Sequence, residues 1–210
     1  MLDADIGVLR LGDDTFDVLQ RLADGGAELL DEPALREQVA LLRSAFVLDT
    51  EGRFHPSLVS AIAAIRQADN ALTLTERDQV TRVWLTPVRA ALLLPLDDTL
   101  RRRLTDLPVW ALPDAVSRLV DLGPRPRPAE AEPVSLSELL AGGIRRRWTL
   151  ERTDLQADDG TLGGSIEVVD TEAGLWVVEQ GDDGLASPSN PTAVWRAMIS
   201  LVRPSGGVGR

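Results

Sequence analysis

The chain lacks two residue types on which many enzymes and metal sites depend. Its 210 residues include no cysteine and no lysine. Without cysteine, disulfide bonds, thiolate zinc sites and cysteine nucleophiles are excluded. Because all 22 basic residues are arginine, Schiff-base chemistry and a Walker-type phosphate-binding lysine are excluded as well.

Excess positive charge and long apolar runs are also missing. The formal net charge is −11, so the chain has no surplus of cations with which to release counterions from nucleic acid. No apolar run approaches the roughly 20 residues that cross a bilayer. Residues 1–5 are acidic, unlike the start of a secretory signal peptide. These features predict a cytoplasmic protein that neither binds nucleic acid nor inserts into a membrane.

Histidine is scarce, and the acidic clusters have no metal-binding spacing. His55 is the only histidine; it stands in a turn before Pro56, where a solvated or locally hydrogen-bonded ring is favoured over a catalytic one. Residues 158–159 and 182–183 are aspartate pairs followed by glycine, but Asp-Asp-Gly is an ordinary turn composition and calcium-loop spacing is absent. We therefore expect no catalytic residue, no cofactor and no metal.

The last third of the chain contains the clearest structural pattern, a β-hairpin. Residues 165–170 and 175–178 are two β-rich runs around a short turn. Gly174 suits the left-handed conformation that such hairpin loops need. Residues 175–178 are apolar on both faces, which predicts a central strand.

A final helix follows after a turn-rich loop. Asn190 or Thr192 is placed to cap it, and Pro191 suits its first turn. The predicted buried face comprises Val194, Trp195, Met198, Ile199, Leu201 and Val202.

The first third of the chain predicts three helices. Residues 14–30 form the first, weakened or ended at Gly25–Gly26. A second begins at Glu32–Pro33 and has apolar residues at spacings of three and four as far as Phe46. Residue 56 or 57 begins the third. The next predicted elements are strands at residues 71–75, 81–85 and 90–94, followed by helices at residues 100–104 and 113–122.

Residues 123–133 read as a linker, because four prolines alternate with charged residues and favour an extended polyproline II segment. Residues 135–140 predict one or two helical turns that start near Ser137 and end at Gly142–Gly143. Residues 148–153 predict a strand.

Two stretches suggest an internal duplication. Residues 113–118 align with residues 191–196 at identical Pro, Ala, Val and Arg, and residues 86–94 align with residues 170–178. A duplication favours one merged sheet; chance similarity between two amphipathic units is an equally weighted alternative. We expect one α+β domain over residues 1–210, made of a helical layer (1–70), a first sheet-and-helix half (71–123), the linker (124–133), a second half (134–203) and a tail (204–210).

Arginine triplets and tryptophans are the candidate contact residues. Residues 101–103 and 145–147 offer bidentate contacts to a carboxylate-rich partner, although pairing with the chain's own acids is the more heavily weighted alternative. Three of the five tryptophans fall in predicted strands and one falls in the last helix, so we expect most of them to be core residues. Trp110 lies in a loop-like stretch and is the best candidate for an exposed anchor.

Several runs resemble the EspG family of the actinobacterial type VII (ESX) secretion systems. They are FVLDTEGRFHP at residues 46–56, LGPRPRP at residues 122–128 and VDTEAGLW at residues 169–176. They are similar to the family's D-x-x-G-R-x-H-P turn between two helices, its Pro/Arg-rich crossover and its D-T-x-x-G-R-W hairpin. Two departures are visible: Leu175 replaces the expected basic residue, and only residues 135–143 stand where a helical bundle is expected.

The resemblance implies an α+β fold with a twisted, mostly antiparallel central sheet, flanking helices and pseudo-two-fold halves. It also implies a cytosolic, non-enzymatic chaperone that binds the tip of a helical PE/PPE- or WxG-like secretion substrate. Such a chaperone covers an apolar tip that would otherwise aggregate.

The predicted partner-binding residues surround the short helix near residue 140. They are Leu139, Leu140, Arg145, Arg146, Arg147 and Trp148, together with Arg196 on the last helix and Trp110. Two other classes stay open: an acidic immunity protein that neutralises a basic toxin, and a small enzyme that uses acidic residues alone.

Overall fold

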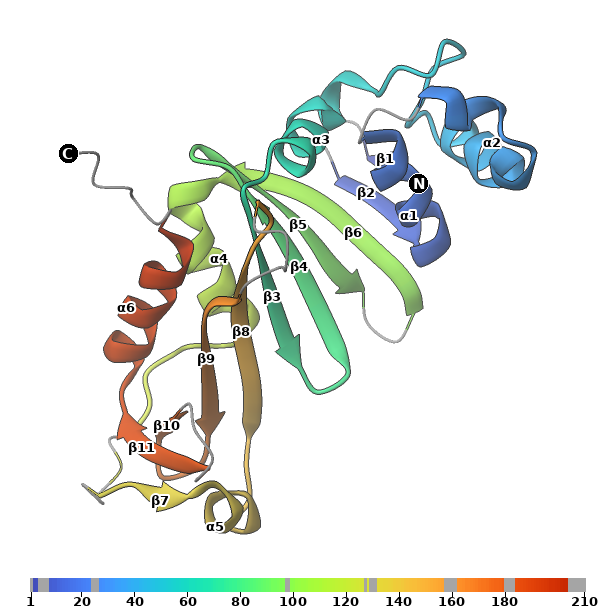
Figure 1. Cartoon of the computed structure of the whole chain (residues 1–210). Helices are drawn as coiled ribbons and strands as arrows, with labels where there is room; N and C mark the ends of the chain where they lie inside the picture. Colours follow the sequence, from blue (N-terminus) through green and yellow to red (C-terminus); the bar gives the residue numbers. More distant parts are fainter. Residues whose placement is uncertain are drawn as a thin grey trace, which may run out of the picture. The chain divides into compact units, whose positions relative to one another are not determined.

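The computed structural model describes residues 2–3, 8–23, 27–96, 99–126, 128, 132–156, 162–179 and 184–203. The architecture is α+β, with a large, mostly antiparallel sheet flanked by helices (Figure 1), and this confirms the predicted fold class. The chain packs as two compact units. The first is Met1–Ala71 with Thr81–Val109, and the second is Leu72–Val80 with Trp110–Arg210.

The strands of the first unit are hydrogen-bonded in the order β1-β2-β6-β5-β4. Their bounds are β1 Leu2–Asp3, β2 Val8–Gly12, β4 Gln79–Leu85, β5 Arg89–Leu96 and β6 Thr99–Pro108. The predicted helix at residues 100–104 is wrong, because this stretch belongs to β6. Leu104 pairs with Leu93 of β5 and is fully buried, so pairing with β5 and burial outweigh the local sequence preference. The predicted helical layer also did not anticipate β1 and β2.

Three helices and three 3-10 turns make up the helical part of the first unit in the residues that the structure describes. The elements are α1 Asp13–Ala23, η1 Ala27–Asp31, η2 Pro33–Leu35, α2 Arg36–Ser44, η3 Pro56–Leu58 and α3 Val59–Arg66. Helices α1 and α3 pack on strands of the sheet, and the apolar side chains between them form one continuous core. Within this core, the ring centroids of Phe16 and Trp84 are 5.7 Å apart.

Helix α2 ends at Ser44, two residues before Phe46. The N–H of Val47 donates to the carbonyl of Leu42 at 2.9 Å, and that of Phe46 donates to the carbonyl of Arg43 at 3.0 Å. This pair of bonds is a Schellman motif, which closes a helix with one residue in the left-handed conformation. Phe46 is that residue, with φ of 58°, and its side chain is 77% exposed. The prediction that the second helix includes Phe46 is therefore wrong.

The predicted turn that contains His55 and precedes Pro56 is confirmed. Asp49 Oδ1 accepts hydrogen bonds from the N–H groups of Glu51 and Arg53 at 2.8 and 2.9 Å, and Leu48 bridges to Phe54. The bonds from the Arg53 backbone and side chain lower the pKa of Asp49 below its ordinary value of 3.8. His55 Nδ1 accepts from the N–H of Ser57 at 3.3 Å, which is the local hydrogen bond expected for this ring.

The strands of the second unit follow the order β3-β8-β9-β10-β11-β7. Their bounds are β3 Asn70–Glu76, β7 Val134–Ser135, β8 Arg146–Asp154, β9 Leu162–Asp170, β10 Leu175–Val178 and β11 Leu185–Ser189. The predicted hairpin is confirmed as β9 and β10, with Leu175 opposite Asp170 and Gly174 at a φ of 138°. The turn-rich loop predicted before the last helix contains β11, which was not expected.

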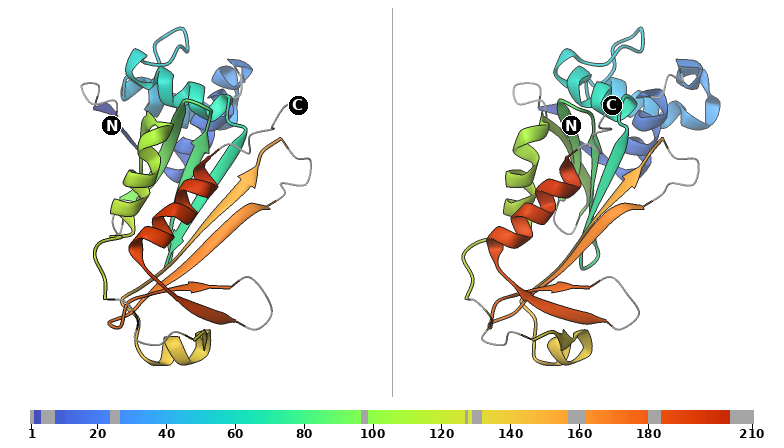
Figure 2. Two further views of the ribbon diagram at one scale, coloured as in Figure 1. Left: turned by 90° about the vertical axis from the view of Figure 1, so that its left-hand side faces the viewer. Right: turned by 60° about the vertical axis from the view of Figure 1, so that its left-hand side comes forward.

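The helices of this unit are α4 Leu112–Leu119, α5 Leu136–Ala141 and α6 Pro191–Val202. Figure 2 shows α4 and α6 side by side, and α6 packs on β8 and β9. The predicted start of α6 is confirmed: Asn190 caps it by accepting from the N–H of Ala193 at 3.0 Å. Trp195 is 38% exposed, so its place in the predicted buried face is wrong. Helix α5 is capped by Ser135, two residues before the predicted start at Ser137.

In the described residues the predicted pseudo-two-fold repeat is not seen. Helices α4 and α6, which align in sequence, belong to the same unit and pack on each other. Pro191 is the first residue of α6, whereas Pro113 is the second residue of α4. The predictions for Gly25–Gly26, for the aspartate pairs at residues 158–159 and 182–183, for the tail and for part of the linker lie outside the described residues.

Candidate functional site

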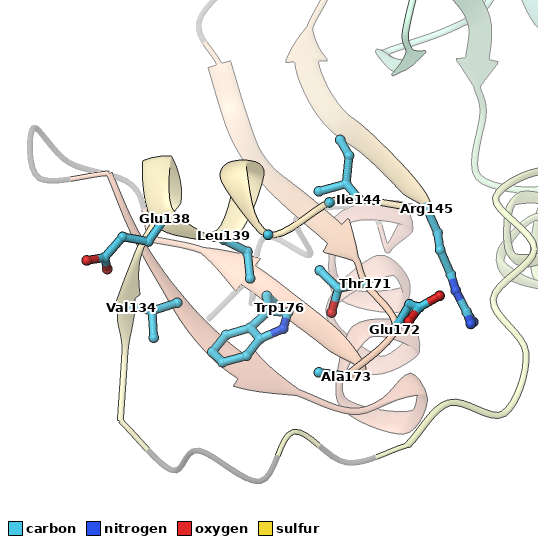
Figure 3. Close-up of a pocket in the computed structure, with 11 residues that line it drawn as sticks. Val134, Glu138, Leu139, Ile144, Arg145, Thr171, Glu172, Ala173 and Trp176 are labelled. Atoms are coloured by element: carbon cyan, nitrogen blue, oxygen red, sulfur yellow. The ribbon is translucent and has the colours of Figure 1, made fainter.

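Helix α5 and the turn of the β9–β10 hairpin enclose a hollow of about 670 Å³. Figure 3 shows the side chains that line it. Its apolar members are Val134, Leu139, Ile144, Ala173 and Trp176, and its polar side chains come from Glu138, Arg145, Thr171 and Glu172. We call this space the α5 hollow.

Short-range interactions build the α5 wall of the hollow. The hydroxyl of Ser135 accepts a hydrogen bond from the N–H of Glu138 at 3.2 Å, which caps the first turn of α5. Gly143 follows the helix at a φ of 88°, a conformation that glycine adopts without steric cost. The chain can therefore leave α5 sharply and enter β8.

Trp176 forms the floor of the hollow because of the strand register. It pairs with Val169 on β9 and Pro188 on β11, and alternate strand residues point to opposite faces. On its face, Val169, Trp176 and Ala186 are buried, and Leu136 and Leu139 of α5 pack against them. Trp176 is 2% exposed, yet its indole Nε1 has no hydrogen-bond partner among the described residues.

The hairpin is held in place by the Pro/Arg stretch, at the turn and at Asp170. Nε of Arg125 donates to Oδ2 of Asp170 at 2.8 Å, and both side chains are largely buried. This hydrogen bond raises the pKa of the Arg125 guanidinium above its ordinary value. A side chain at Gly174 would collide with the Pro126 carbonyl and the Pro128 ring. The described part of the linker is thus fastened to the hairpin by a buried ion pair and close packing.

A second concavity, of about 500 Å³, adjoins the α5 hollow. Four arginines line it, at positions 77, 145, 146 and 147, with Ile144, Trp148 and two threonines. Ile144 and Arg145 line both spaces. We call the second space the arginine groove.

The arginines of the groove differ in how they are paired. Nε of Arg146 lies 2.6 Å from a Glu76 carboxylate oxygen, and Nε of Arg147 lies 2.5 Å from Glu167. The alternative weighed for the arginine triplets was pairing with the chain's own acids, and it applies to these two residues. In the other triplet it applies to Arg102, which pairs with Asp13. Arg145 has no ion pair within the described residues, so its guanidinium remains available at the junction of the two concavities.

The structure brings some predicted site residues together and separates others. Leu139 lines the α5 hollow, whereas Leu140 is on the same helix but not in the lining. Trp148 is 2% exposed and contributes mainly to the core. Arg196 is exposed on α6, and Trp110 is 77% exposed in the 3-10 turn Val109–Ala111; neither lines the hollow or the groove.

Trp176 and Ile144 are two apolar lining residues that are not among the predicted site residues. Trp176 belongs to a strand that is apolar on both faces, so its pattern predicts only burial. Ile144 is 42% exposed between two glycines and three arginines. An isolated apolar residue in such a polar stretch was the signal that could have identified it.

Metal-binding groups, membrane-spanning helices and sequence relatives were each sought. Across the described ranges, no group of three or more histidine, aspartate or glutamate side chains is placed to hold a metal ion. No helix in the same ranges is long and apolar enough to cross a membrane. No family model matches the chain, and no curated protein matches it significantly.

Proposed function

We propose that the protein is a non-enzymatic chaperone or adaptor that holds a helical partner at the α5 hollow and the arginine groove. One observation carries the proposal: an apolar hollow with a tryptophan floor opens directly beside a groove lined by four arginines. Buried aromatic and arginine side chains are the residue types that dominate protein–protein binding energies.

The chemistry of the two spaces defines the partner. An apolar side chain inserted against Trp176 and Leu139 would gain about 1.5–3 kcal/mol from burial. A carboxylate on the same partner could pair with Arg145, because this guanidinium has no ion pair among the described residues. Glu138 and Glu172 on the rim favour a partner that is not acidic throughout. A helix tip with an apolar end and an acidic flank meets these requirements.

The resemblance to EspG chaperones supports a PE/PPE- or WxG-like type VII secretion substrate as this partner, bound in the cytoplasm before export. The alternative, an immunity protein against a basic toxin, would need another surface, because arginines line this one. The test below distinguishes the two.

The protein should be purified with a tag from a strain that co-expresses its genomic neighbours, and the companions identified by mass spectrometry. We expect a helical partner at equal stoichiometry. Leu139→Asp and Arg145→Glu should each reduce its recovery at least tenfold. The matched controls Leu155→Asp and Arg118→Glu change exposed residues of the same type outside both spaces and should not affect recovery. A cationic toxin domain, or a partner retained by both site variants, would contradict the proposal.

A further inference from the structure

The floor of the α5 hollow holds a buried hydrogen-bond donor. Trp176 lines the hollow and is 2% exposed, and its indole Nε1 has no hydrogen-bond partner among the described residues. In Figure 3 the indole nitrogen lies on the side of the ring nearer Thr171. The hydroxyl of Thr171 donates to the carbonyl of Gly174 at 3.1 Å, so it is held within the hairpin turn.

A buried donor without a partner lowers the stability of the folded protein. Such a group calls for an explanation, and one explanation is an acceptor that a ligand supplies. The indole N–H can only donate. An occupant of the hollow that satisfies Trp176 must therefore present an acceptor atom, such as a carbonyl oxygen, as well as apolar surface.

A second donor opens onto the same space. Arg145 lines the hollow and has no ion pair among the described residues. Two acids, Glu138 and Glu172, also belong to the lining, but both are exposed, so water and salt screen their charges. The hollow thus combines apolar walls with an unpaired donor on its floor and an unpaired cation in its lining.

The C-terminal end of an α-helix offers the matching groups. Its last carbonyl groups have no partner within the helix, and partial negative charge gathers at that end. The N-terminal end presents unpaired N–H groups and partial positive charge instead. These N–H groups would meet Trp176 and Arg145 donor to donor.

We infer that the helical partner enters the α5 hollow with its C-terminal end first, and that a carbonyl of its last turn accepts a hydrogen bond from Nε1 of Trp176. Arg145 faces the negative end of the helix dipole. The inference rests on the proposed function, to which it adds the direction of the partner helix. Trp176 is then a specificity-determining residue, because only one end of a helix satisfies its donor.

Two alanine-based helical peptides of about 15 residues, blocked at both ends, test this direction. They have the same composition, but one carries a pair of leucines in its last turn and the other carries them in its first turn. Each is titrated into ¹⁵N-labelled protein while NMR spectra follow the indole N–H signals of the five tryptophans. The last-turn peptide should bind about tenfold more tightly and should move the Trp176 signal downfield, as a new hydrogen bond does.

Trp176→Phe keeps an aromatic ring and removes the donor. It identifies the Trp176 signal as the one that disappears, and unchanged positions of the other indole signals show that the variant folds. The variant should bind the last-turn peptide about tenfold more weakly and lose the preference between the peptides. The matched control Trp195→Phe removes an N–H from α6, at a position that lines neither the hollow nor the groove, and should change neither property.

The outcomes separate this inference from the proposed function. Equal binding of the two peptides, tighter binding of the first-turn peptide, binding of neither peptide, or binding that Trp176→Phe leaves unchanged would each overturn the inference. The proposed function is judged by the partner recovered from the co-expressing strain. A partner that is lost with Leu139→Asp but retained in full by Trp176→Phe would support the proposed function and reject the inference alone.

Discussion

Trp84 and Trp176 are both buried strand tryptophans, but their surroundings differ. Trp84 belongs to the large core of the first unit and packs against Phe16. Trp176 belongs to a cluster of three buried residues, and the α5 hollow opens on its face. One ring is enclosed by a continuous core, whereas the other forms the floor of a concavity. Burial of a tryptophan therefore does not say whether it serves the core or a binding surface.

The two regions are also held together differently. In the first unit, helices α1 and α3 cover the sheet through apolar contacts, and α2 packs on α1. In the second unit, the hairpin beneath the α5 hollow depends on a buried ion pair, a glycine without room for a side chain, and a six-residue helix. We expect substitutions in the first region to reduce stability mainly when they remove side-chain volume from the core. In the second region, we expect stability to fall when a substitution breaks the ion pair or adds a side chain where there is no room.

The largest expected difference is between the two tryptophans. Trp84→Ala should destabilise the protein by about 3–5 kcal/mol, because it leaves a cavity in a close-packed core. Trp176→Ala should cost about 1–3 kcal/mol less, since it also removes a buried N–H that has no hydrogen-bond partner among the described residues. Urea unfolding of both variants measures the difference. Equal losses would show that the buried Trp176 N–H does not reduce the stability of the folded protein.

The buried ion pair of the hairpin should give the next largest effect. Asp170→Asn leaves the largely buried Arg125 guanidinium without its carboxylate and should cost about 3 kcal/mol. Asp121→Asn removes the other carboxylate on Arg125, which is 75% exposed, and should cost at most about 1 kcal/mol. Urea unfolding compares them. A similar cost for both variants would mean that Asp170 is not the residue that holds the linker.

A comparison of Gly174 with Gly143 separates the cost of a steric clash from the cost of a positive φ. Gly174→Ala should cost about 2 kcal/mol or more, because φ is positive and the new methyl group meets the Pro126 carbonyl and the Pro128 ring. Gly143 also has positive φ, but nothing lies within 4 Å of an added methyl group. Gly143→Ala should therefore cost about 1 kcal/mol. If thermal unfolding shows the same loss for both, the packing of the linker on the hairpin is not the cause.

The smallest expected effect is the pH response of the turn at Asp49. Its pKa is lowered in the folded state, so the charged form contributes stability above the ordinary value of 3.8. That contribution is lost as pH falls through the folded-state pKa. The Tm of the wild type should slightly exceed that of Asp49→Asn at neutral pH, and the two values should converge below pH 3.8. A difference that persists in acid would have another origin.

Sequence patterns predicted the interactions between residues close together in the chain. Asn190 caps the last helix through Ala193, Gly174 closes the hairpin turn, and His55 bonds to Ser57. In each case the partner lies two to four residues away, so the residue types alone specify the bond. The alternation of Leu72 and Leu74 likewise identified β3, in which both are buried.

Predictions failed where a distant segment decided the outcome. The stretch at residues 100–104 is compatible with a helix, but pairing with β5 makes it a strand. Residues 185–189 contain Pro188 and read as a loop, yet they pair with β10. Pro188 is tolerated because β7 pairs only with Leu185 and Ala186, so the missing N–H is not needed there. Phe46 continued a helical spacing but lies beyond the end of α2.

The candidate site depended most on tertiary structure. The sequence alone determined the α+β class, the hairpin, the helix caps and an arginine-rich stretch beside a short helix, because these follow from periodicity and local bonds. Only the tertiary structure decided that Arg125 meets Asp170, 45 residues away, that Trp176 becomes the floor of a hollow, and that Arg145 is left without an ion pair among the described residues. Strand register and the packing of α5 set these outcomes, and both arise from contacts between segments far apart in the chain.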